Sequence, residues 1–385
     1  MKPHDSTASG ARWDFRTDRT LLELLALNAT HHAEGIALRE KDRGIWQQTT
    51  WSQWLEEVLC CAAGLESLGF GPADGLVVLG DNRPHLYSGM LAAGALRGHA
   101  MPVYPDATPD EIRHVVEQSG ARYVLAEDQE QVDKMLDLRE SCPHIDHVLY
   151  DDPRGMGAYT DAGLLSWTGL VAQGRARLQA DPALREQLLT RACADDIAVF
   201  IHSSGTTGKP KGVMLTHSNV ISGVANAYRA KAFDFGEEIL AYLPMAWIGD
   251  FAMTLGAGIA LQFTINIPES AETVLHNLRE IAPTFYLAAP RSWDNMLTMV
   301  QVRMEDSTPL KKALYTHFMD AALRIERHKL SGGMPTLGDR FTRWLGEWLV
   351  YGPIRTSWDS AACVMRSPVA RRLAKTPSCS TGPWG

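Results

Sequence analysis

Apolar residues recur along the first sixty positions at the spacing of helices that bury one face. The leucine-rich run at 21–27 follows a polar lead-in over residues 1–19. Trp51, Trp54, Val58 and Leu59 repeat the three- and four-residue spacing. These patterns predict two amphipathic helices near the start of the chain.

Between residues 76 and 150 short apolar runs alternate with amphipathic segments. The alternation predicts strands at 76–79, 101–104, 123–126 and 147–150, and helices at 84–97, 109–118 and 129–139. Pro84 suits the first turn of its helix, and Thr108 is a predicted N-cap with acids at 110 and 111 behind it. Strands and helices that alternate in this way predict a largely parallel α/β sheet.

A second α/β block is predicted beyond a weakly periodic stretch at 151–194, which we expect to be a helical insertion on the surface. The block has predicted strands at 197–201, 239–243 and 284–289, and predicted helices at 218–229, 251–261 and 271–281. Residues 291–350 are predicted to be mostly helical. The expected organisation is a first α/β block at 20–150, the insertion, and a second block at 195–355.

Composition narrows the class of protein. The chain has 385 residues, 45% hydrophobic, and a net charge of −8, which excludes wholesale disorder and gives no basic footprint for nucleic acid. The start lacks the apolar run of a secretory signal, and the longest apolar stretch, 251–263, is shorter than the roughly 20 residues that span a bilayer. The six cysteines form no CxxC pair, which favours reduced thiols over a zinc site. We therefore expect a cytoplasmic protein.

The last thirty residues differ from the rest of the chain. From Thr356 to Gly385 there are four basic residues and one acid, whereas the chain up to Arg355 carries 33 basic and 44 acidic residues. The tail holds two cysteines, five serines and three prolines, and its apolar residues follow neither helical nor strand spacing. An ordinary basic tail is one interpretation, and a foreign or frameshifted segment is the other.

One run carries the chemistry, His202-Ser203-Ser204-Gly205-Thr206-Thr207-Gly208-Lys209-Pro210-Lys211-Gly212, between a predicted strand and a predicted helix. Its glycines allow backbone N–H groups to approach a ligand, its hydroxyls can contact phosphate or Mg²⁺, and its lysines supply positive charge. The run is not a Walker A loop, because Pro210 follows the lysine where that motif has Ser or Thr. No GxGxxG motif indicates a dinucleotide site either. The run predicts a polyphosphate-binding loop.

The run at 203–212 resembles the signature loop of the adenylate-forming enzymes, which include acyl-CoA synthetases, peptide-synthetase adenylation domains and luciferases. The likeness continues through residues 213–219, and the stretches at 51–71, 95–106 and 242–245 resemble further motifs of that family. It covers about residues 20–355 and is greatest to bacterial long-chain fatty acyl-CoA synthetases. The resemblance implies stacked α/β subdomains with largely parallel sheets, here the N-terminal portion of the family's large domain.

The resemblance implies a two-step reaction. A fatty acid carboxylate attacks ATP to give acyl-AMP and pyrophosphate, with Mg²⁺ as cofactor, and coenzyme A then takes the acyl group. Lys209 and Thr206 are the implied catalytic residues, and Ser203 or Thr206 is the implied Mg²⁺ ligand. The implied phosphate-binding residues are Ser203, Ser204, Gly205, Thr206, Thr207, Gly208 and Lys209, with Lys211 and Gly212. For Lys211 the alternative is that it anchors the loop to the fold instead of binding phosphate.

The acyl pocket is expected near residues 242–250. Met245 lies in the motif that leads into the pocket. Trp247 occupies the position where many relatives have histidine, and it either gates the acyl tunnel or packs in the core. Asp250 is expected to cap a helix. No histidine base is needed in pyrophosphate release, so His202 is not expected to be catalytic.

The resemblance ends near Arg355. The family's Tyr-Gly-x-Thr-Glu motif, its ribose-binding aspartate, its adenylation lysine and its C-terminal lid domain are not found after that residue. We therefore expect a truncated acyl-CoA ligase that is inactive alone. The alternatives are a non-catalytic nucleotide-binding remnant or an interaction partner of a full-length relative, and, more remotely, an unrelated phosphate-binding transferase. The expected partners are small molecules, and a lipid substrate allows contact with a membrane surface, although no strongly basic amphipathic helix marks one.

Overall fold

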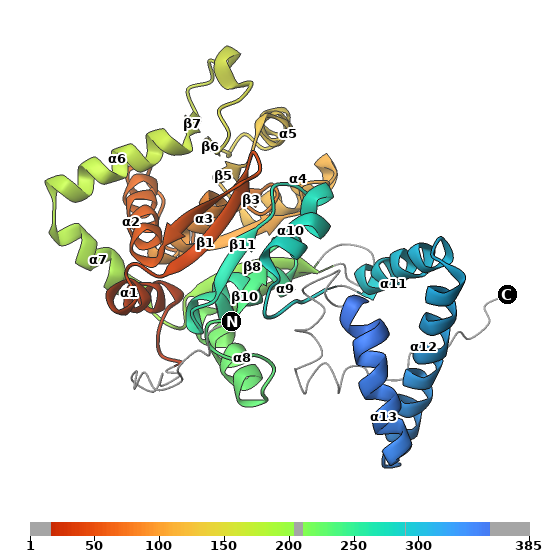
Figure 1. The fold of residues 1–385 in the computed structure, drawn as a ribbon. Coiled ribbons are helices and arrows are strands. Elements are labelled where there is room, and N and C mark those ends of the chain that lie inside the picture. The colour runs from red at the N-terminus through yellow and green to blue at the C-terminus, as the bar shows by residue number, and fades with distance from the viewer. Residues whose placement is uncertain (1–16, 204–210, 289, 355–385) are drawn as a thin grey trace.

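Two sheets form the body of the protein (Figure 1). The computed structural model describes residues 17–203, 211–288 and 290–354. The larger sheet has the order β7-β6-β5-β3-β4-β8-β9, parallel except for the final β8–β9 pair, and the smaller has the order β10-β11-β1-β2. The strands are β1 (Ile36–Asp42), β2 (Ile45–Thr50), β3 (Gly75–Leu79), β4 (His99–Val103), β5 (Tyr123–Ala126), β6 (His147–Tyr150), β7 (Leu164–Ser166), β8 (Ile197–Ser203), β9 (Lys211–Thr216), β10 (Glu238–Leu240) and β11 (Thr264–Ile267).

Helices cover both faces of the larger sheet. The helices are α1 (Leu21–His31), α2 (Trp51–Ser67), α3 (Pro84–Ala95), α4 (Pro109–Ser119), α5 (Gln129–Arg139), α6 (Trp167–Ala180), α7 (Ala183–Arg191), α8 (His217–Arg229), α9 (Ile248–Phe251), α10 (Val274–Ile281), α11 (Pro290–Glu305), α12 (Pro309–Leu330) and α13 (Leu337–Gly346). The described residues also include two 3-10 helices, η1 (Met156–Ala158) and η3 (Ala271–Thr273), and two π-helical segments, η2 (Ala252–Gly258) and η4 (Glu347–Tyr351).

The strands of the larger sheet are buried on both sides. In β3, Leu76 and Val78 belong to the apolar core beneath α2 and α3, whereas Val77 and Leu79 belong to the core beneath α4 and α5. A parallel strand covered on two faces has no polar side, which explains the uninterrupted apolar runs in the sequence. The α/β fold class is therefore confirmed, with sheets that are largely parallel.

Most predicted elements are present with bounds within a few residues. The predicted strand at 284–289 is wrong, because residues 284–288 run without strand pairing although Tyr286 is buried against Leu240 and Leu278. The predicted strand at 239–243 is confirmed only over its first two residues, since β10 ends at Leu240. The hairpin β1–β2 and the buried strand β11 were not predicted. Strand β1 has three apolar residues followed by four charged ones, so it lacks the alternation of a half-buried strand. Its pairing with β11, more than two hundred residues later, leaves no local signal.

Residues 151–194 differ from the expected surface insertion. They contain the expected helices, α6 and α7, but they also add β7 to the edge of the larger sheet. Helix α6 lies against α2 so closely that a Cβ atom on Gly174 would fall 1.7 Å from the carbonyl oxygen of Cys60. This segment is therefore an integral layer of the body.

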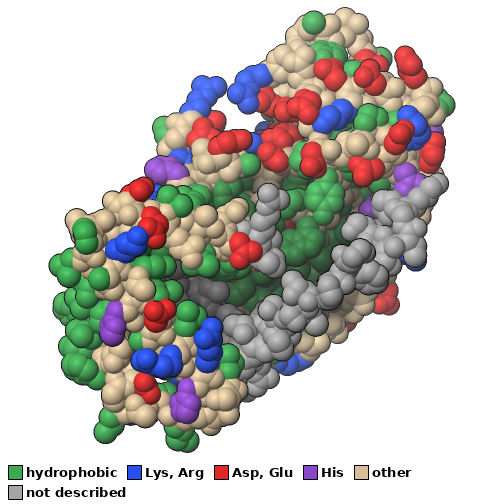
Figure 2. All heavy atoms as spheres, turned by 90° about the vertical axis from the view of Figure 1, so that its right-hand side faces the viewer, with side chains coloured by type: hydrophobic (Ala, Val, Ile, Leu, Met, Phe, Trp, Pro, Cys, Tyr) green, Lys and Arg blue, Asp and Glu red, His purple; other side chains and the backbone are tan. Residues whose placement is uncertain are grey.

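Helices α11–α13 with η4, here called the C-terminal helical unit, stand beside the body (Figure 1). The unit contacts the body through Trp293, whose ring centroid lies 5.8 Å from that of Tyr286. Figure 2 faces this unit and shows acidic side chains gathered over the upper part of the molecule, away from it. No helix in the described ranges combines the length and apolar character needed to cross a membrane.

Candidate functional site

The predicted phosphate loop connects two antiparallel strands. In the β8–β9 hairpin, His202 pairs with Gly212 and Ser203 pairs with Lys211, so the seven intervening residues are closed off at their base. Ser204, Gly205, Thr206, Thr207, Gly208 and Lys209 lie outside the described residues, as does the side chain of Ser203. The structure thus places Lys211 and Gly212 and the two ends of the loop.

The base of this loop lies at the carboxyl edge of the larger sheet. Strand β8 runs parallel to β4, and β4 runs parallel to β3, so the end of β8 points the same way as the ends of β3, β5 and β6. Ligands of open α/β sheets bind beyond the carboxyl ends of their strands. The loop therefore leaves the sheet at the edge where a ligand site is expected.

The hairpin base is packed closely around Gly212. A Cβ atom at this position would fall 2.0 Å from the ring of Phe200, so glycine is needed for this approach. The imidazole of His202 packs beside the same ring and lies 3.3 Å from Gln118 Oε1. Burial lowers the pKa of His202. At neutral pH His202 is therefore a neutral packing residue, and the lysines remain the source of positive charge at the loop.

The residues after the hairpin have a structural role. Thr216 Oγ1 accepts a hydrogen bond from the Asn219 backbone amide, and Asn219 Oδ1 accepts one from the Thr216 amide, which forms a capping box at the start of α8. His217 is buried, and burial lowers its pKa to about 4. Its Nδ1 accepts a hydrogen bond from the Leu21 amide at the start of α1. Thr216, His217 and Asn219 therefore serve helix capping and packing in this structure.

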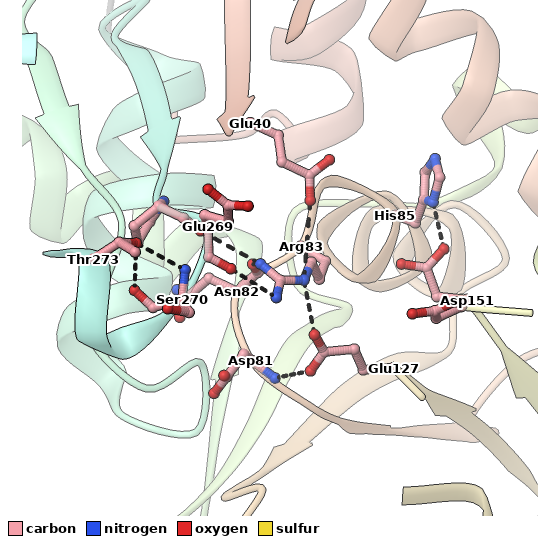
Figure 3. A network of polar contacts seen from close by, with 12 residues as sticks. Glu40, Asp81, Asn82, Arg83, His85, Glu127, Asp151, Glu269, Ser270 and Thr273 are labelled. Atoms are coloured by element: carbon pink, nitrogen blue, oxygen red, sulfur yellow. Dashed lines mark hydrogen bonds and ion pairs between the residues drawn. The ribbon is translucent and has the colours of Figure 1, made fainter. Parts of the chain in front are cut away.

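Arg83 joins the two sheets at the same edge (Figure 3). It follows β3, and its Nε donates to Glu127 Oε1, at 2.7 Å, just after β5. Its terminal nitrogens reach the carbonyl oxygens of Pro268 and Glu269, which follow β11. Burial raises the pKa of Glu127, and the charge of Arg83 opposes that shift. Arg83 therefore fixes the position of one strand end relative to the others.

A second ion pair lies along this edge, between His85 and Asp151. His85 Nδ1 is 2.5 Å from Asp151 Oδ1, and the ring of His85 stacks on Trp167. Burial would lower the pKa of His85, but the hydrogen bond to Asp151 and the nearby carboxylates raise it to about 9. At neutral pH His85 is therefore a cation that ties α3 to the end of β6.

The expected helix cap at Asp250 is wrong. Trp247 occupies the N-cap position of α9, and the Asp250 side chain points into the protein, where its two oxygens accept hydrogen bonds from Tyr87 Oη, at 2.8 Å, and Asn82 Nδ2, at 3.0 Å. Asn82 also donates to the carbonyl oxygen of Leu243. Burial raises the pKa of Asp250 to about 7, although hydrogen bonds from Tyr87, Asn82 and Thr254 act to lower it.

This buried cluster joins the loop after β3 to the segment expected to lead into the acyl pocket. The sequence does offer a signal for it, since Asp250 is the one charged residue between Ala246 and Leu261. A void of about 10 Å³ beside Asp250 and Thr254 has room for about one water molecule. The cluster therefore acts here as a fixed support and leaves no open cavity for a ligand.

The two expected pocket residues lie in different environments. Met245 is buried in the main core, whereas Trp247 is partly exposed, with its ring against Gly249. Neither residue lines the void beside Asp250. Packing in the core, one of the two roles expected for Trp247, does not fit its partly exposed ring. The other role, gating of the acyl tunnel, stays a prediction.

The expected Mg²⁺ ligands are the hydroxyl groups of Ser203 and Thr206, both outside the described side chains. Within the described part of the chain, no cluster of three His, Cys, Asp or Glu residues is arranged to hold a metal ion. The donors that the loop offers, hydroxyls beside lysines, suit an ion that reaches the protein bound to phosphate oxygens and keeps part of its water shell.

Comparison with known proteins shows which family's sequence profile matches this chain. The profile described as AMP-binding enzyme matches residues 25–365. The chain is 25% identical over 326 residues to the long-chain-fatty-acid–CoA ligase ACSBG2 of Xenopus laevis. The aligned region covers 82% of this chain and 43% of the relative. It is 27% identical over 261 residues to the long-chain-fatty-acid–CoA ligase FadD15 of Mycobacterium bovis, 66% of this chain and 40% of the relative. The chain spans about half the length of the curated relatives it matches.

Solved structures share the fold. The crystal structure of VinN superposes with a TM-score of 0.58 at 20% identity, over 77% of this chain and 67% of that one. A fatty acyl-adenylate ligase from L. pneumophila, solved with acyl adenylate and pyrophosphate, gives a TM-score of 0.55 at 16% identity, over 72% and 45% of the two chains. These likenesses show a common architecture for the body described above.

Proposed function

The chain belongs to the family of AMP-binding enzymes, and from this membership we propose that it carries the phosphate-binding half of an ATP-dependent ligase that joins a long-chain fatty acid to coenzyme A. The observation that carries the proposal is the run at 203–212, which closes a hairpin at the carboxyl edge of a parallel sheet. The fatty acid is proposed from the names of the relatives.

In this proposal the loop holds the β- and γ-phosphates of ATP. The backbone N–H groups of Gly205 and Gly208 and the hydroxyls of Ser204, Thr206 and Thr207 would donate to the phosphate oxygens, and Lys209 would neutralise the charge that develops on the departing pyrophosphate. Mg²⁺, bound with ATP, supplies further charge neutralisation. Lys211 and Gly212 fix the base of the loop.

The chemistry that follows requires positioning more than proton transfer. The fatty acid carboxylate displaces pyrophosphate at the α-phosphorus, and the thiolate of coenzyme A then displaces AMP from the acyl carbonyl. A chain that holds the reactants in line lowers the barrier by removing their freedom to move apart. We therefore propose ATP binding at this loop as the first activity to test, and ligase turnover as the second.

The second candidate function is a non-catalytic nucleotide-binding protein or a partner of a full-length relative. The same run at 203–212 favours it, because a loop that holds phosphate can bind a nucleotide without catalysing its conversion. ATP–pyrophosphate exchange distinguishes the two functions, because exchange requires formation of the acyl-adenylate and binding does not.

We predict that Lys209→Ala weakens ATP binding by about tenfold, in line with the loss of one charge-assisted contact. Calorimetric titration of the purified chain with Mg·ATP measures this change. Lys231→Ala is the matched control, because Lys231 lies over the Tyr228 ring, beyond the C-terminal end of α8.

A fatty acid of sixteen carbons is then added and pyrophosphate exchange is followed. Exchange above that of Lys209→Ala supports the ligase, and binding without exchange supports the non-catalytic alternative. Equal ATP affinity in the chain and in Lys209→Ala, or no binding at millimolar ATP, would overturn both.

A further inference from the structure

One buried polar cluster fastens both ends of the segment that leads into α9. Asn82, in the loop after β3, donates through Nδ2 to the carbonyl oxygen of Leu243, at 3.0 Å, and to Asp250 Oδ1, at 3.0 Å. Tyr87 of α3 donates through its Oη to Asp250 Oδ2, at 2.8 Å. Residues 243–250, here called the entry segment, therefore have their first and last residues tied to the same loop.

Between these two ties the entry segment turns outward. The Trp247 amide donates to the carbonyl oxygen of Pro244, and the Asp250 amide donates to that of Trp247. Trp247 and Ile248 are 37% and 38% exposed, whereas Asp250 is 2% exposed. The stretch from Trp247 to Gly249 therefore lies at the surface, and Asp250 is the residue that returns the chain to the interior.

Asp250 also lies in an irregular helix. Helix α9 has four residues and passes directly into the π-helical η2. A π-helix is rare and occurs mostly at functional sites. Thr254 Oγ1 donates to the carbonyl oxygen of Asp250, at 2.8 Å. Because a helix as short as α9 has little stability of its own, the side-chain contacts of Asp250 decide where α9 lies.

The carboxyl group of Asp250 is surrounded by donors without a cation. Among the described residues, the groups that act on its ionisation are Tyr87 from α3, Asn82 from the loop after β3 and Thr254 from η2, and only Tyr87 titrates. Burial raises the pKa of Tyr87 well above its usual range, so Tyr87 stays protonated at neutral pH. Strand β10 and the stretch at 285–287 close the remaining side with apolar side chains. Hydrogen bonds favour the carboxylate and burial favours the acid, so the two forms are nearly balanced at pH 7.

We propose that Asp250, Tyr87 and Asn82 form a proton-linked latch, which holds the entry segment closed and releases it as Asp250 gives up its proton to water. In the closed arrangement the void of about 10 Å³ beside Asp250 has room for about one water molecule, so a hydrocarbon chain passes this point only after the segment moves. That acyl role rests on the proposed ligase function, whereas the latch itself rests on the contacts above.

The direction of the pH effect follows from linkage. In the closed segment the pKa of Asp250 is about 7, and opening exposes the carboxyl group to water, where the ordinary pKa is 3.8. The closed segment therefore holds the proton more tightly than the open one. Its advantage is full below about pH 4 and is lost as the pH rises to about 7, so a rising pH favours opening across this range.

The test is hydrogen exchange followed by mass spectrometry of peptides from residues 243–258, at pH 5 and pH 8 and corrected for intrinsic exchange rates. We expect the opening equilibrium of these residues to rise at least about tenfold from pH 5 to pH 8. We also expect them to open more readily than β5, which lies in the core, at both pH values.

Three variants accompany the wild type. Asp250→Asn cannot ionise, so its residues 243–258 should open equally at both pH values. Tyr87→Phe removes a donor to the carboxylate and should move the response to higher pH, which a merely structural role would not do. Asp234→Asn replaces an exposed aspartate and is the matched control, which should behave as the wild type. Circular dichroism checks that each variant folds.

Two outcomes overturn the latch. One is exchange of residues 243–258 at the rate of β5 at each pH, and the other is a pH response that Asp250→Asn retains. Addition of a fatty acid of sixteen carbons separates the latch from the ligase proposal. A pH response that the fatty acid leaves unchanged supports the latch and counts against the acyl role of the segment. A change with fatty acid but none with pH overturns the latch and supports the ligase proposal.

Discussion

Burial changes the acid–base chemistry of single side chains in this protein, and Asp250 is the clearest case. Its carboxyl group accepts hydrogen bonds from Tyr87 and Asn82 and is 2% exposed. Taking a carboxylate out of water favours its protonated form, so the pKa of Asp250 rises to about 7 from 3.8. The folded state therefore binds a proton more tightly at this residue than the unfolded state does.

The sign of this difference sets a pH dependence. Because the pKa of Asp250 is higher in the folded state, its contribution to stability is full below about pH 4 and is lost as the pH rises to about 7. We predict that Asp250→Asn abolishes this pH-dependent loss of stability. Relative to the variant, the wild-type free energy of unfolding should fall by on the order of 4 kcal/mol between pH 4 and pH 8.

Urea unfolding at a series of pH values measures that difference. Asp234→Asn, which replaces an exposed aspartate, is the control and should track the wild type. A constant difference between wild type and Asp250→Asn across this range would show that Asp250 titrates normally.

At the scale of the element, the β8–β9 hairpin decides how the phosphate loop is held. Strand β8 pairs with β9 from Ile197 to Ser203. Backbone hydrogen bonds therefore fix both ends of the loop, independently of the loop side chains. Gly212 allows the Phe200 ring to close over the strand at the base of the loop. The glycine that the family resemblance assigned to phosphate binding therefore has a packing role of its own.

We predict that Gly212→Ala lowers the free energy of unfolding by about 1–3 kcal/mol, because the added methyl group collides with the Phe200 ring. Phe200→Leu in the same chain should recover part of the loss. Gly223→Ala is the control, since a Cβ atom at Gly223 in α8 meets nothing within 4 Å and alanine is the better helix former.

Chemical denaturation of the four proteins provides the comparison. A Gly212→Ala variant as stable as the wild type, or one that Phe200→Leu does not help, would contradict the packing role.

For the whole molecule, polar contacts at the carboxyl edge hold the two sheets in one arrangement. Arg83 contacts Glu127, which follows β5 of the larger sheet (Figure 3). It also contacts the carbonyl oxygens of Pro268 and Glu269, which follow β11 of the smaller sheet. A partly buried carboxylate that loses its cation keeps the cost of its desolvation and loses the compensation. The edge on which the loop lies is therefore sensitive to this one side chain.

We predict that Arg83→Met destabilises the protein by about 2–4 kcal/mol, and that Arg83→Met/Glu127→Gln is less destabilised than the single variant, because only Glu40, of the two carboxylates that face Arg83, is then left without this cation. Thermal unfolding of both variants tests this. Arg154→Met removes an ion pair with Asp152 in which the arginine is 84% exposed, and it should change stability by less than about 1 kcal/mol. A double variant less stable than Arg83→Met would contradict the explanation.

Several sequence expectations stay predictions. The cytoplasmic location, the boundary of a tail at 356, the Mg²⁺ ligands and the roles of Lys209 and Thr206 fall on residues or properties that neither the described structure nor the comparisons test. The alternation of strand and helix, the fold class and the family are confirmed, and the caps at Thr108 and Thr216 follow from short-range hydrogen bonds.

The sequence by itself determined what depends on near neighbours. Helices, caps and the parallel strands at 76–150 follow from spacing over a few residues, and the loop at 203–212 follows from the residue types that phosphate needs. The tertiary structure decided the features that depend on residues far apart in the sequence. The pairing of β1 with β11, the burial of Asp250 and the exposure of Phe341 and Trp344 on α13 each depend on which surface lies opposite. A helix with one apolar face predicts that the face will be covered, but only the fold decides whether protein or another medium covers it.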